Sequence, residues 1–139
     1  MYKKLFSLVV VSALSLFVMS GCVSNQSNLS NASEKVRGLI QKHNLEVVDY
    51  DYVKKTINKG TRKSANAILI DARPEKKHMV SAVPSSINIP DTKFESAYKQ
   101  LEGVKKDKEL IVYCGGWKCG KSPKVANMLK KKGFTNVKL

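Results

Sequence analysis

The stretch LIVYCGGWKCGKSPKVANMLKKKGF, residues 110–134, decides the fold. It opens with an apolar run that ends at Cys114 and is typical of a buried strand. A glycine-rich loop follows, and Ser122 before Pro123 predicts a helix start, with serine at the cap and proline at the first position. An apolar stripe runs along this helix, which Gly133 ends. The stretch therefore predicts a strand, a loop and a helix, with a cysteine where the strand ends.

The loop also fits a phosphate-binding pattern. Residues Gly115 to Ser122 match G-x-x-x-x-G-K-[ST] letter for letter. In nucleotide-binding proteins such a loop cradles phosphates with its amides, while the lysine and the hydroxyl serve the outer phosphates and magnesium. After Ser122, however, the chain reaches Leu139 too soon for a downstream strand-borne acid that would help to hold the metal. We therefore interpret the loop as the setting of a reactive thiol.

A cysteine between a strand end and a helix N-terminus lies where backbone amides form an anion-binding nest. We expect this field, with the lysines of the loop, to lower the pKa of Cys114 and to stabilise its thiolate or persulfide. The glycines suit a tight ring of backbone around one sulfur. The predicted anion-binding residues are Gly115, Gly116, Trp117, Lys118, Gly120, Lys121 and Ser122.

Strands and helices alternate along the remaining chain. Apolar runs predict strands at 45–49, 67–71, 86–89, 109–114 and 134–139. Amphipathic patterns predict helices at 33–43, 50–60, 91–103 and 122–133, and a capping box at Thr92 and Glu95 starts the third. Residues 72–85 are expected to be irregular. This order predicts an α/β domain with a mostly parallel sheet flanked by helices. Sites in such sheets lie at the C-terminal strand ends, where Asp71 and Cys114 fall.

The N-terminus has the features of a secretory signal. Two lysines are followed by an apolar run from Leu5 to Met19, which is too short for a comfortable membrane span, and by small residues before Cys22. The ending resembles the lipobox of bacterial lipoproteins, in which Cys22 carries lipid. An uncleaved anchor or an ordinary secretory signal are the alternatives, and all three place the domain outside the cytoplasm.

These features divide the chain into three parts. Residues 1–21 are expected to be a lipoprotein signal peptide, and the polar residues 22–33 a flexible tether. Residues 34–139 form the domain. We accordingly expect a membrane-anchored lipoprotein that faces the periplasm or the cell exterior.

The formal net charge is +14, which favours anionic partners. The lysines are scattered rather than interleaved with aromatic residues, so specific nucleic-acid binding is not expected. No spacing of histidine, cysteine or acidic residues predicts a metal, and no cofactor is expected. His43 and His78 have no partner pattern and are expected to be surface residues.

Three segments in order resemble the rhodanese (sulfurtransferase) family, from about Val47 to the end. They are ILIDARP at 68–74, AVPSSINIP at 82–90, and VYC at 112–114 with GKSPKVANMLKKKGFTNV at 120–137. The resemblance implies a small rhodanese-like domain in which Cys114 is the persulfide-forming nucleophile. It also implies that Asp71 and Arg73, as an Asp-x-Arg pair, support the site rather than take part in the chemistry.

The sequence departs from the family pattern in four ways. The loop from Cys114 to Ser122 is about two residues longer than Cys-x-x-Gly-x-Arg-Ser, and related folds with longer loops act on phosphate or arsenate. Lys121 replaces the arginine, so that a point charge replaces a bidentate fork. Ala82 replaces a histidine, and Ser85 a glycine. The chain also ends before the glycine- and tryptophan-bearing segment that normally completes the domain, so a truncated C-terminal end is expected.

Cys119 is a second thiol in the loop. It is either a small buried residue or a resolving thiol that attacks a Cys114 persulfide, releases reduced sulfur and leaves a Cys114–Cys119 disulfide. Trp117 either shields the site or packs against the fold.

The predicted function is extracytoplasmic sulfur transfer, from a small anionic donor such as thiosulfate or polysulfide to a thiol or protein acceptor, through a Cys114 persulfide. Two alternatives stay open. One is a dithiol/disulfide redox switch that uses Cys114 and Cys119. The other is an inactive rhodanese fold that serves as a binding module.

Overall fold

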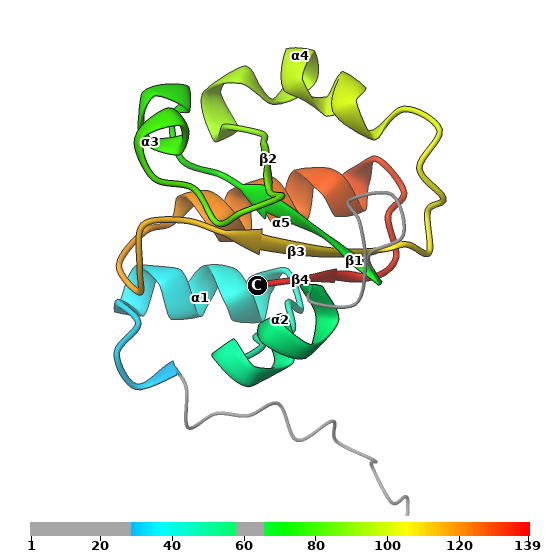
Figure 1. Ribbon diagram of the computed structural model, residues 1–139. Helices are drawn as coiled ribbons and strands as arrows, with labels where there is room; N and C mark the ends of the chain where they lie inside the picture. Colours follow the sequence, from blue (N-terminus) through cyan, green and yellow to red (C-terminus); the bar gives the residue numbers. More distant parts are fainter. Residues whose placement is uncertain (1–28, 58–65) are drawn as a thin grey trace, which may run out of the picture.

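The computed structural model describes residues 29–57 and 66–139, and it shows a sheet with helices on both faces (Figure 1). The predicted signal peptide at 1–21, lipidation at Cys22 and the first part of the predicted tether lie outside the described residues. Among the described helices, none is long and apolar enough to cross a membrane.

The sheet has four strands in the order β2-β1-β3-β4, and every neighbouring pair is parallel. The strands are β1 at Ala67–Asp71, β2 at Ile87–Asn88, β3 at Glu109–Tyr113 and β4 at Val137–Lys138. The register places Asp71 opposite Tyr113, so β1 and β3 end side by side. Cys114 follows β3 at the same edge, which confirms the expected parallel α/β fold and the expected meeting of the two strand ends.

Helices connect the strands. They are α1 at Glu34–Lys42, α2 at Tyr50–Ile57, α3 at Glu75–Val80, α4 at Phe94–Tyr98 and α5 at Lys121–Lys131, with 3-10 turns η2 at Asp91–Lys93 and η3 at Lys99–Leu101. As predicted, Ser33 caps α1: its hydroxyl accepts a hydrogen bond from the Val36 amide at 3.4 Å. This bond satisfies one of the amides that the first turn leaves without a helical partner.

Alternating side chains of the strands make two cores. On one face of the sheet, Ile70, Leu110 and Val112 pack with the buried sides of α1, α4 and α5. On the other face, Leu69 and Ile111 pack with partly buried residues of α2. Because successive side chains of a strand point to opposite faces, a strand covered on both sides is apolar throughout. This explains the unbroken apolar runs of β1 and β3.

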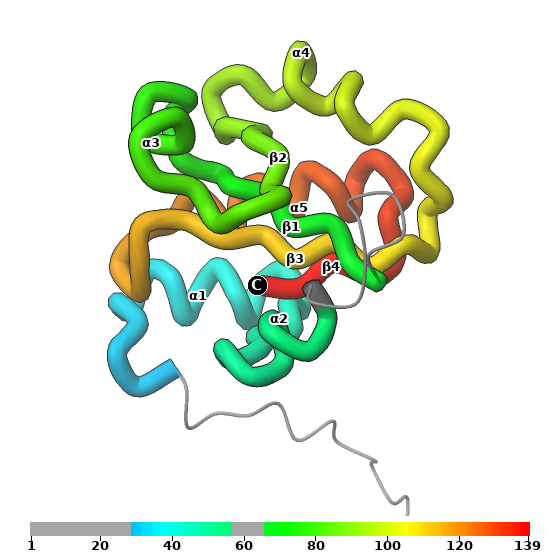
Figure 2. The backbone as a smooth tube through the Cα atoms, viewed as in Figure 1, coloured from blue at the N-terminus to red at the C-terminus, as the bar shows by residue number. Residues whose placement is uncertain are grey.

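The C-terminal strand runs along the segment between α1 and α2 (Figure 2). Glu46 forms an isolated parallel bridge with Lys138, and the Val48 amide donates to the carbonyl of Leu139 at 2.8 Å. The Lys138 ammonium also lies 3.3 Å from the Glu109 carboxylate. These contacts fix the edge of the sheet beyond β3.

Several predicted boundaries are wrong. The strand expected at 45–49 is reduced to the single bridge at Glu46, because the chain there meets only the short β4. Residues 75–80, expected to be irregular, form α3. The helix expected at 91–103 is divided into η2, α4 and η3, and Thr92 caps none of them, since the first turn starts directly after Pro90.

The end of the predicted tether is also part of the fold. Ala32 is buried and Leu29 packs against the main core, so residues 29–33 lie on the domain and are not a free linker. The Ser33 amide donates to the carbonyl of Trp117 at 3.3 Å. The N-terminal segment is thereby attached to the glycine-rich loop.

Candidate active site

The glycine-rich loop connects β3 to α5 at the C-terminal edge of the sheet. The Cys119 amide donates to the carbonyl of Gly116 at 2.9 Å, which closes a turn in the middle of the loop. Gly116 has a φ of 133°, a conformation that side-chain-bearing residues rarely adopt. The loop therefore folds back on itself, and its two cysteines, Cys114 and Cys119, become neighbours while both remain free thiols.

Cys114 lies at the base of the loop. It is half-buried and packs against the main core. Its Sγ donates to the backbone carbonyl of Cys119 at 3.2 Å and lies 3.2 Å from the Ser122 hydroxyl. Burial raises the pKa of the Cys114 thiol and the Cys119 side chain raises it further, against a lowering contribution from Ser122. The thiol form of Cys114 is therefore favoured.

Cys119 has the opposite tendency. Burial alone would raise the pKa of Cys119, but the Cys114 thiol and the backbone amides of Lys121 and Gly115 lower it below its ordinary value. The expectation that the loop lowers the pKa of Cys114 is thus wrong. The backbone amides of the loop lower the pKa of Cys119 instead, because the longer loop places Cys119 next to the start of α5.

Ser122 does not cap α5 as predicted. The helix begins at Lys121, Gly120 is the residue at the cap, and no side chain caps the helix. Pro123 is still in the first turn, where its missing N–H has no helical partner to lose. The Ser122 hydroxyl faces Cys114 instead. Its position beside the strand-end sulfur depends on a tertiary contact that local sequence does not show.

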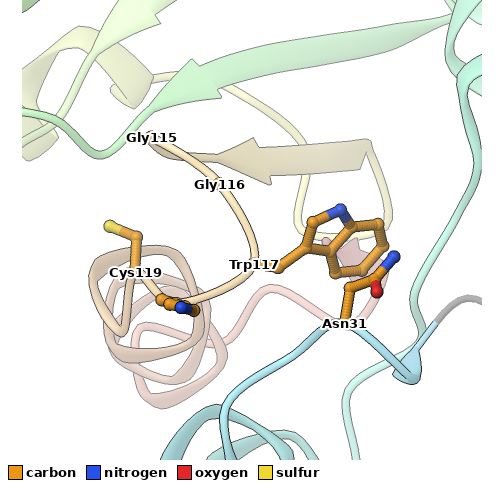
Figure 3. A pocket seen from close by; sticks show the side chains of 6 residues that line it. Asn31, Gly115, Gly116, Trp117 and Cys119 are labelled. Carbon is orange, nitrogen blue, oxygen red and sulfur yellow. The ribbon is translucent and has the colours of Figure 1, made fainter.

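An open pocket of about 660 Å³ lies over the loop. In Figure 3 the Asn31 side chain lies beside the Trp117 indole, while the Cys119 sulfur lies on the other side of the loop. Trp117 is 45% exposed, so it borders the pocket rather than packing in the core. The lining residues are Asn31, Gly115, Gly116, Trp117, Lys118 and Cys119. Asn31 was missed by the sequence analysis, because its segment was expected to be a free tether.

The two lysines of the loop have different roles. Lys118 lines the pocket. Lys121 points to Asp91, with its ammonium 3.0 Å from the carboxylate, and this hydrogen bond raises the pKa of Lys121. Asp91 therefore offsets part of the charge that Lys121 brings to the loop.

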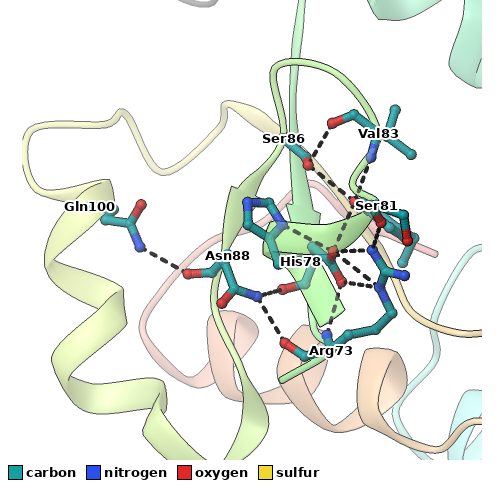
Figure 4. A network of polar contacts seen from close by, with 9 residues as sticks. Arg73, His78, Ser81, Val83, Ser86, Asn88 and Gln100 are labelled. Atoms are coloured by element: carbon teal, nitrogen blue, oxygen red, sulfur yellow. Dashed lines mark hydrogen bonds and ion pairs between the residues drawn. The ribbon is translucent and has the colours of Figure 1, made fainter. Parts of the chain in front are cut away.

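Asp71 lies at the end of β1 and is fully buried. Its carboxylate contacts Arg73 and His78, which Figure 4 shows within a network of polar contacts. The Arg73 guanidinium donates to both of its carboxylate oxygens, at 2.7 to 3.1 Å. The Tyr113 hydroxyl and the His78 Nδ1 each lie 3.0 Å from Asp71 Oδ2. Burial alone would raise the pKa of Asp71, but the hydrogen bonds from Arg73, His78 and Tyr113 hold it at about 2.

This network joins the site's supporting segments. Arg73 also donates to the backbone carbonyl of Ser81, and the Asn88 amide donates to the carbonyls of Asp71 and Arg73 at 2.9 and 2.8 Å. Asp71 and Arg73 contact each other and the neighbouring segments. Through these contacts the network connects the end of β1 to β2 and to the residue after α3.

His78 and Tyr113 were missed by the sequence analysis. The expectation that His78 has no partner is wrong, because α3 carries its ring back to the end of β1. Recognition of α3 directly after Pro74 would have indicated this return. Tyr113 is paired with Asp71 by the strand register, which a single sequence does not specify. Among the described residues, no group of three histidine, cysteine or acidic side chains could hold a metal.

The sequence matches the family model of the rhodanese-like domain over residues 49–139. No curated protein matches it significantly. Solved structures share the fold. The BH2092 protein from Bacillus halodurans is 26% identical, with a TM-score of 0.57 over 76% of this chain and 72% of that one.

Two further structures are more distant in sequence. The human single-domain sulfurtransferase TSTD1 is 20% identical, with a TM-score of 0.53 over 66% of this chain and 85% of that one. The rhodanese-like domain of the Alr3790 protein from Anabaena sp. is 16% identical, with a TM-score of 0.53 over 66% of this chain. The match spans 64% of that domain, which is less than two thirds of its length.

Proposed function

Because the chain belongs to the rhodanese-like domain family, we propose that it is a sulfurtransferase that forms a persulfide on a cysteine of the Cys114–Cys119 loop. The donor is a small anion such as thiosulfate or polysulfide, and the acceptor is a thiol or a protein. The observation that carries this proposal is a pair of free thiols between a parallel strand end and a helix N-terminus, under an open pocket.

The reaction divides into two displacements. A cysteine thiolate attacks the outer sulfur of thiosulfate, and sulfite leaves with the electron pair of the broken S–S bond. The enzyme then carries a persulfide anion. An acceptor thiolate attacks the outer sulfur of this persulfide and regenerates the cysteine thiolate. Each displacement conserves charge and needs no metal or cofactor.

The pocket supplies what an anionic donor needs. Lys118 brings a positive charge to its lining, and Gly115 and Gly116 leave the loop backbone uncovered by side chains. Exposed backbone amides and an ammonium group favour an anion over a neutral molecule. The replacement of the family's arginine by Lys121, which is paired with Asp91, predicts weak discrimination among small sulfur oxyanions.

The sequence of residues 1–33 supports a location for this activity. The basic start, the apolar run and the Gly-Cys ending suggest that Cys22 carries lipid and attaches the enzyme to a membrane surface outside the cytoplasm. A Cys22→Ser variant expressed in the native host should then leave the membrane fraction. Retention in that fraction after a carbonate wash would contradict lipid attachment.

The direct test of sulfur transfer is release of sulfite. The full-length reduced chain, mixed with thiosulfate, should release about one sulfite per protein in a single turnover, and added cyanide should give thiocyanate continuously. A Cys114→Ser/Cys119→Ser double variant should release none. Absence of sulfite release from thiosulfate, together with no gain of one sulfur in protein mass after polysulfide treatment, in a protein that circular dichroism shows to be folded, would overturn the proposal.

A redox switch is the second candidate, and the position of the Cys114 sulfur at 3.2 Å from the Cys119 backbone favours it. Such a switch would lose two hydrogens on mild oxidation without releasing sulfite from thiosulfate. Intact mass after each treatment separates the two functions, because only sulfur transfer leaves the mass of one sulfur on a variant with a single cysteine in the loop.

A further inference from the structure

Residues 79–84, at the end of α3 and in the turn before β2, are all exposed, although most of them are apolar. Met79 and Val80 are 78% and 84% exposed, and Val83 is 39% exposed. Isolated apolar side chains are ordinary on a protein surface, but a contiguous set is typical of an interaction site. We infer that this apolar segment docks an acidic partner protein, whose cysteine accepts sulfur from the loop. The inference rests on the proposed sulfurtransferase function and names the class of acceptor.

Hydrogen bonds hold the apolar segment beside the thiol loop. The Val83 amide donates to the Tyr113 hydroxyl at 3.1 Å, and the Ser86 hydroxyl lies 3.0 Å from the same oxygen. Tyr113 is the last residue of β3 and directly precedes Cys114. Figure 1 shows α3 and the loop after β3 at the same end of the sheet. A protein that covers the apolar segment therefore lies next to the thiols.

The charge around the apolar segment is positive. Neither residues 76–90 nor residues 110–139 contain an aspartate or a glutamate. Two acids border the first stretch, and each is paired with a lysine: Glu75 with Lys93 and Asp91 with Lys121. The exposed lysines of α3 and the loop are Lys76, Lys77 and Lys118. Because complementary charge steers partners together and disfavours wrong ones, this surface favours a partner with acidic side chains.

A small thiol needs no such surface, whereas a cysteine on a folded protein must be guided to the half-buried Cys114. An apolar centre with a charged rim, in which methionine and tryptophan are enriched, is the usual anatomy of a protein interface. The loop itself adds Trp117, which is 45% exposed. A lipid surface on the same residues would also cover the loop and exclude a dissolved anionic donor. A protein, in contrast, can dissociate between the two displacements.

The transfer to the partner is a single displacement. The partner's cysteine thiolate attacks the outer sulfur of the loop persulfide and forms a new S–S bond. The bond between the outer sulfur and the loop cysteine breaks, and this cysteine leaves as a thiolate with the electron pair. The partner then carries the persulfide, and no oxidant or reductant is consumed. The apolar segment binds the acceptor and does not enter the chemistry.

Synthetic peptides serve as acceptor probes. In an acidic peptide, leucines and then glutamates flank a single cysteine, and in its counterpart lysines replace the glutamates. Cyanide is the small acceptor that needs no docking. The full-length reduced chain receives thiosulfate, and the persulfide on each peptide and the thiocyanate are measured. We expect the KM of the acidic peptide to be about tenfold lower at low salt, and about 0.5 M salt to remove most of this difference.

Variants of α3 locate the docking surface. Met79→Ser/Val80→Ser should raise the KM of the acidic peptide about fivefold, because it removes apolar contact area, and should leave thiocyanate formation unchanged. Lys76→Glu/Lys77→Glu should raise the same KM about tenfold at low salt. Lys99→Glu/Lys105→Glu changes the charge equally at exposed positions between α4 and β3, and should leave it unchanged. Each comparison uses one peptide, so the pKa of the peptide thiol is constant.

The outcomes separate the docking surface from the proposed function. Normal thiocyanate formation, with KM values that neither pair of α3 substitutions alters, would overturn the docking surface and leave the sulfurtransferase standing. Equal losses with cyanide and with the peptide in Met79→Ser/Val80→Ser would assign the apolar segment to the thiol site instead. Loss of binding to anionic phospholipid vesicles in this variant, with an unchanged peptide KM, would make the occupant a membrane. Absence of sulfite and thiocyanate from the wild type would overturn both proposals.

Discussion

β1 and β3 end side by side, but their ends are stabilised in different ways. At the end of β1, the Asp71 carboxylate is fully buried and receives hydrogen bonds from three side chains. At the end of β3, the glycine-rich loop presents backbone groups and two free thiols to an open pocket. The first end contributes to stability and the second holds the reactive groups. One edge of the sheet thus carries a buried ionic network beside a loop in which Gly115 and Gly116 are exposed.

The largest expected effect is the loss of the buried carboxylate. Asp71→Ala leaves Arg73 and His78 without their shared partner, and removal of one member of a buried ionic group costs about 3 kcal/mol of unfolding free energy. Urea unfolding of the full-length chain measures it. Glu75→Ala is the matched control: its pair with Lys93 spans 3.5 Å with both side chains more than 60% exposed, so its loss should cost below about 0.5 kcal/mol. An equal loss of unfolding free energy in the two variants would show that the buried Asp71 network contributes no more than an exposed ion pair.

The same carboxylate should make stability depend on pH. The pKa of Asp71 is about 2 in the folded chain, against 3.8 for the ordinary group. A lowered folded pKa contributes stability that is fully present above the unfolded pKa. This contribution is lost as the pH falls through the folded value. We expect a loss of roughly 2 kcal/mol between pH 4 and pH 2, and Asp71→Asn should lose less over this range. Unfolding curves that fall equally in both proteins would show that other carboxylates dominate.

At the reactive end, the two thiols should differ in rate. Because the pKa of Cys119 is lowered and that of Cys114 is raised, iodoacetamide at neutral pH should alkylate Cys119 on the order of tenfold faster. Trypsin cleaves after Lys118, so the tryptic peptides 109–118 and 119–121 report alkylation of Cys114 and of Cys119 separately. Urea-unfolded protein is the control, since the two rates should there become similar. A faster rate at Cys114 in the folded chain would contradict the opposite directions of the two pKa shifts.

A smaller effect should follow from the ion pair next to the loop. Asp91→Asn frees the Lys121 ammonium, whose charge lowers the pKa of Cys119. Alkylation of Cys119 near pH 7 should become about twofold faster, and added salt at about 0.5 M should remove most of the gain. Asp107→Asn changes the charge equally at an exposed site in the turn before β3, and it should leave the rate unchanged. Equal acceleration by both variants would indicate a nonspecific effect of net charge.

The sequence was sufficient for the parts of the fold that depend on local pattern. The apolar runs at 67–71 and 109–114 became β1 and β3 because both faces of each strand are covered. Their shared edge follows from parallel pairing, so the proximity of Asp71 and Cys114 was also predictable. The family segments pointed to the same loop that the structure places under the pocket.

The details of the site depend on contacts that are remote in the sequence. Ser122 can cap a helix or face a sulfur, and only the return of the loop onto Cys114 decides between them. His78 reaches Asp71 through a short helix without a clear apolar stripe. The direction of the two cysteine pKa shifts depends on which sulfur meets the carbonyl and which meets the amides. Residue types alone do not specify this.

The attachment of residues 29–33 to the domain limits how far that domain could lie from an anchored Cys22. The amide of Ser33 is bonded to the carbonyl of Trp117, and Asn31 borders the pocket. If Cys22 carries lipid, as proposed, the chain from that residue to Leu29 can extend at most about 25 Å. The pocket entrance would then work close to the membrane surface. Sulfur donors and acceptors would have to diffuse to that surface or be held there by proteins of the same layer.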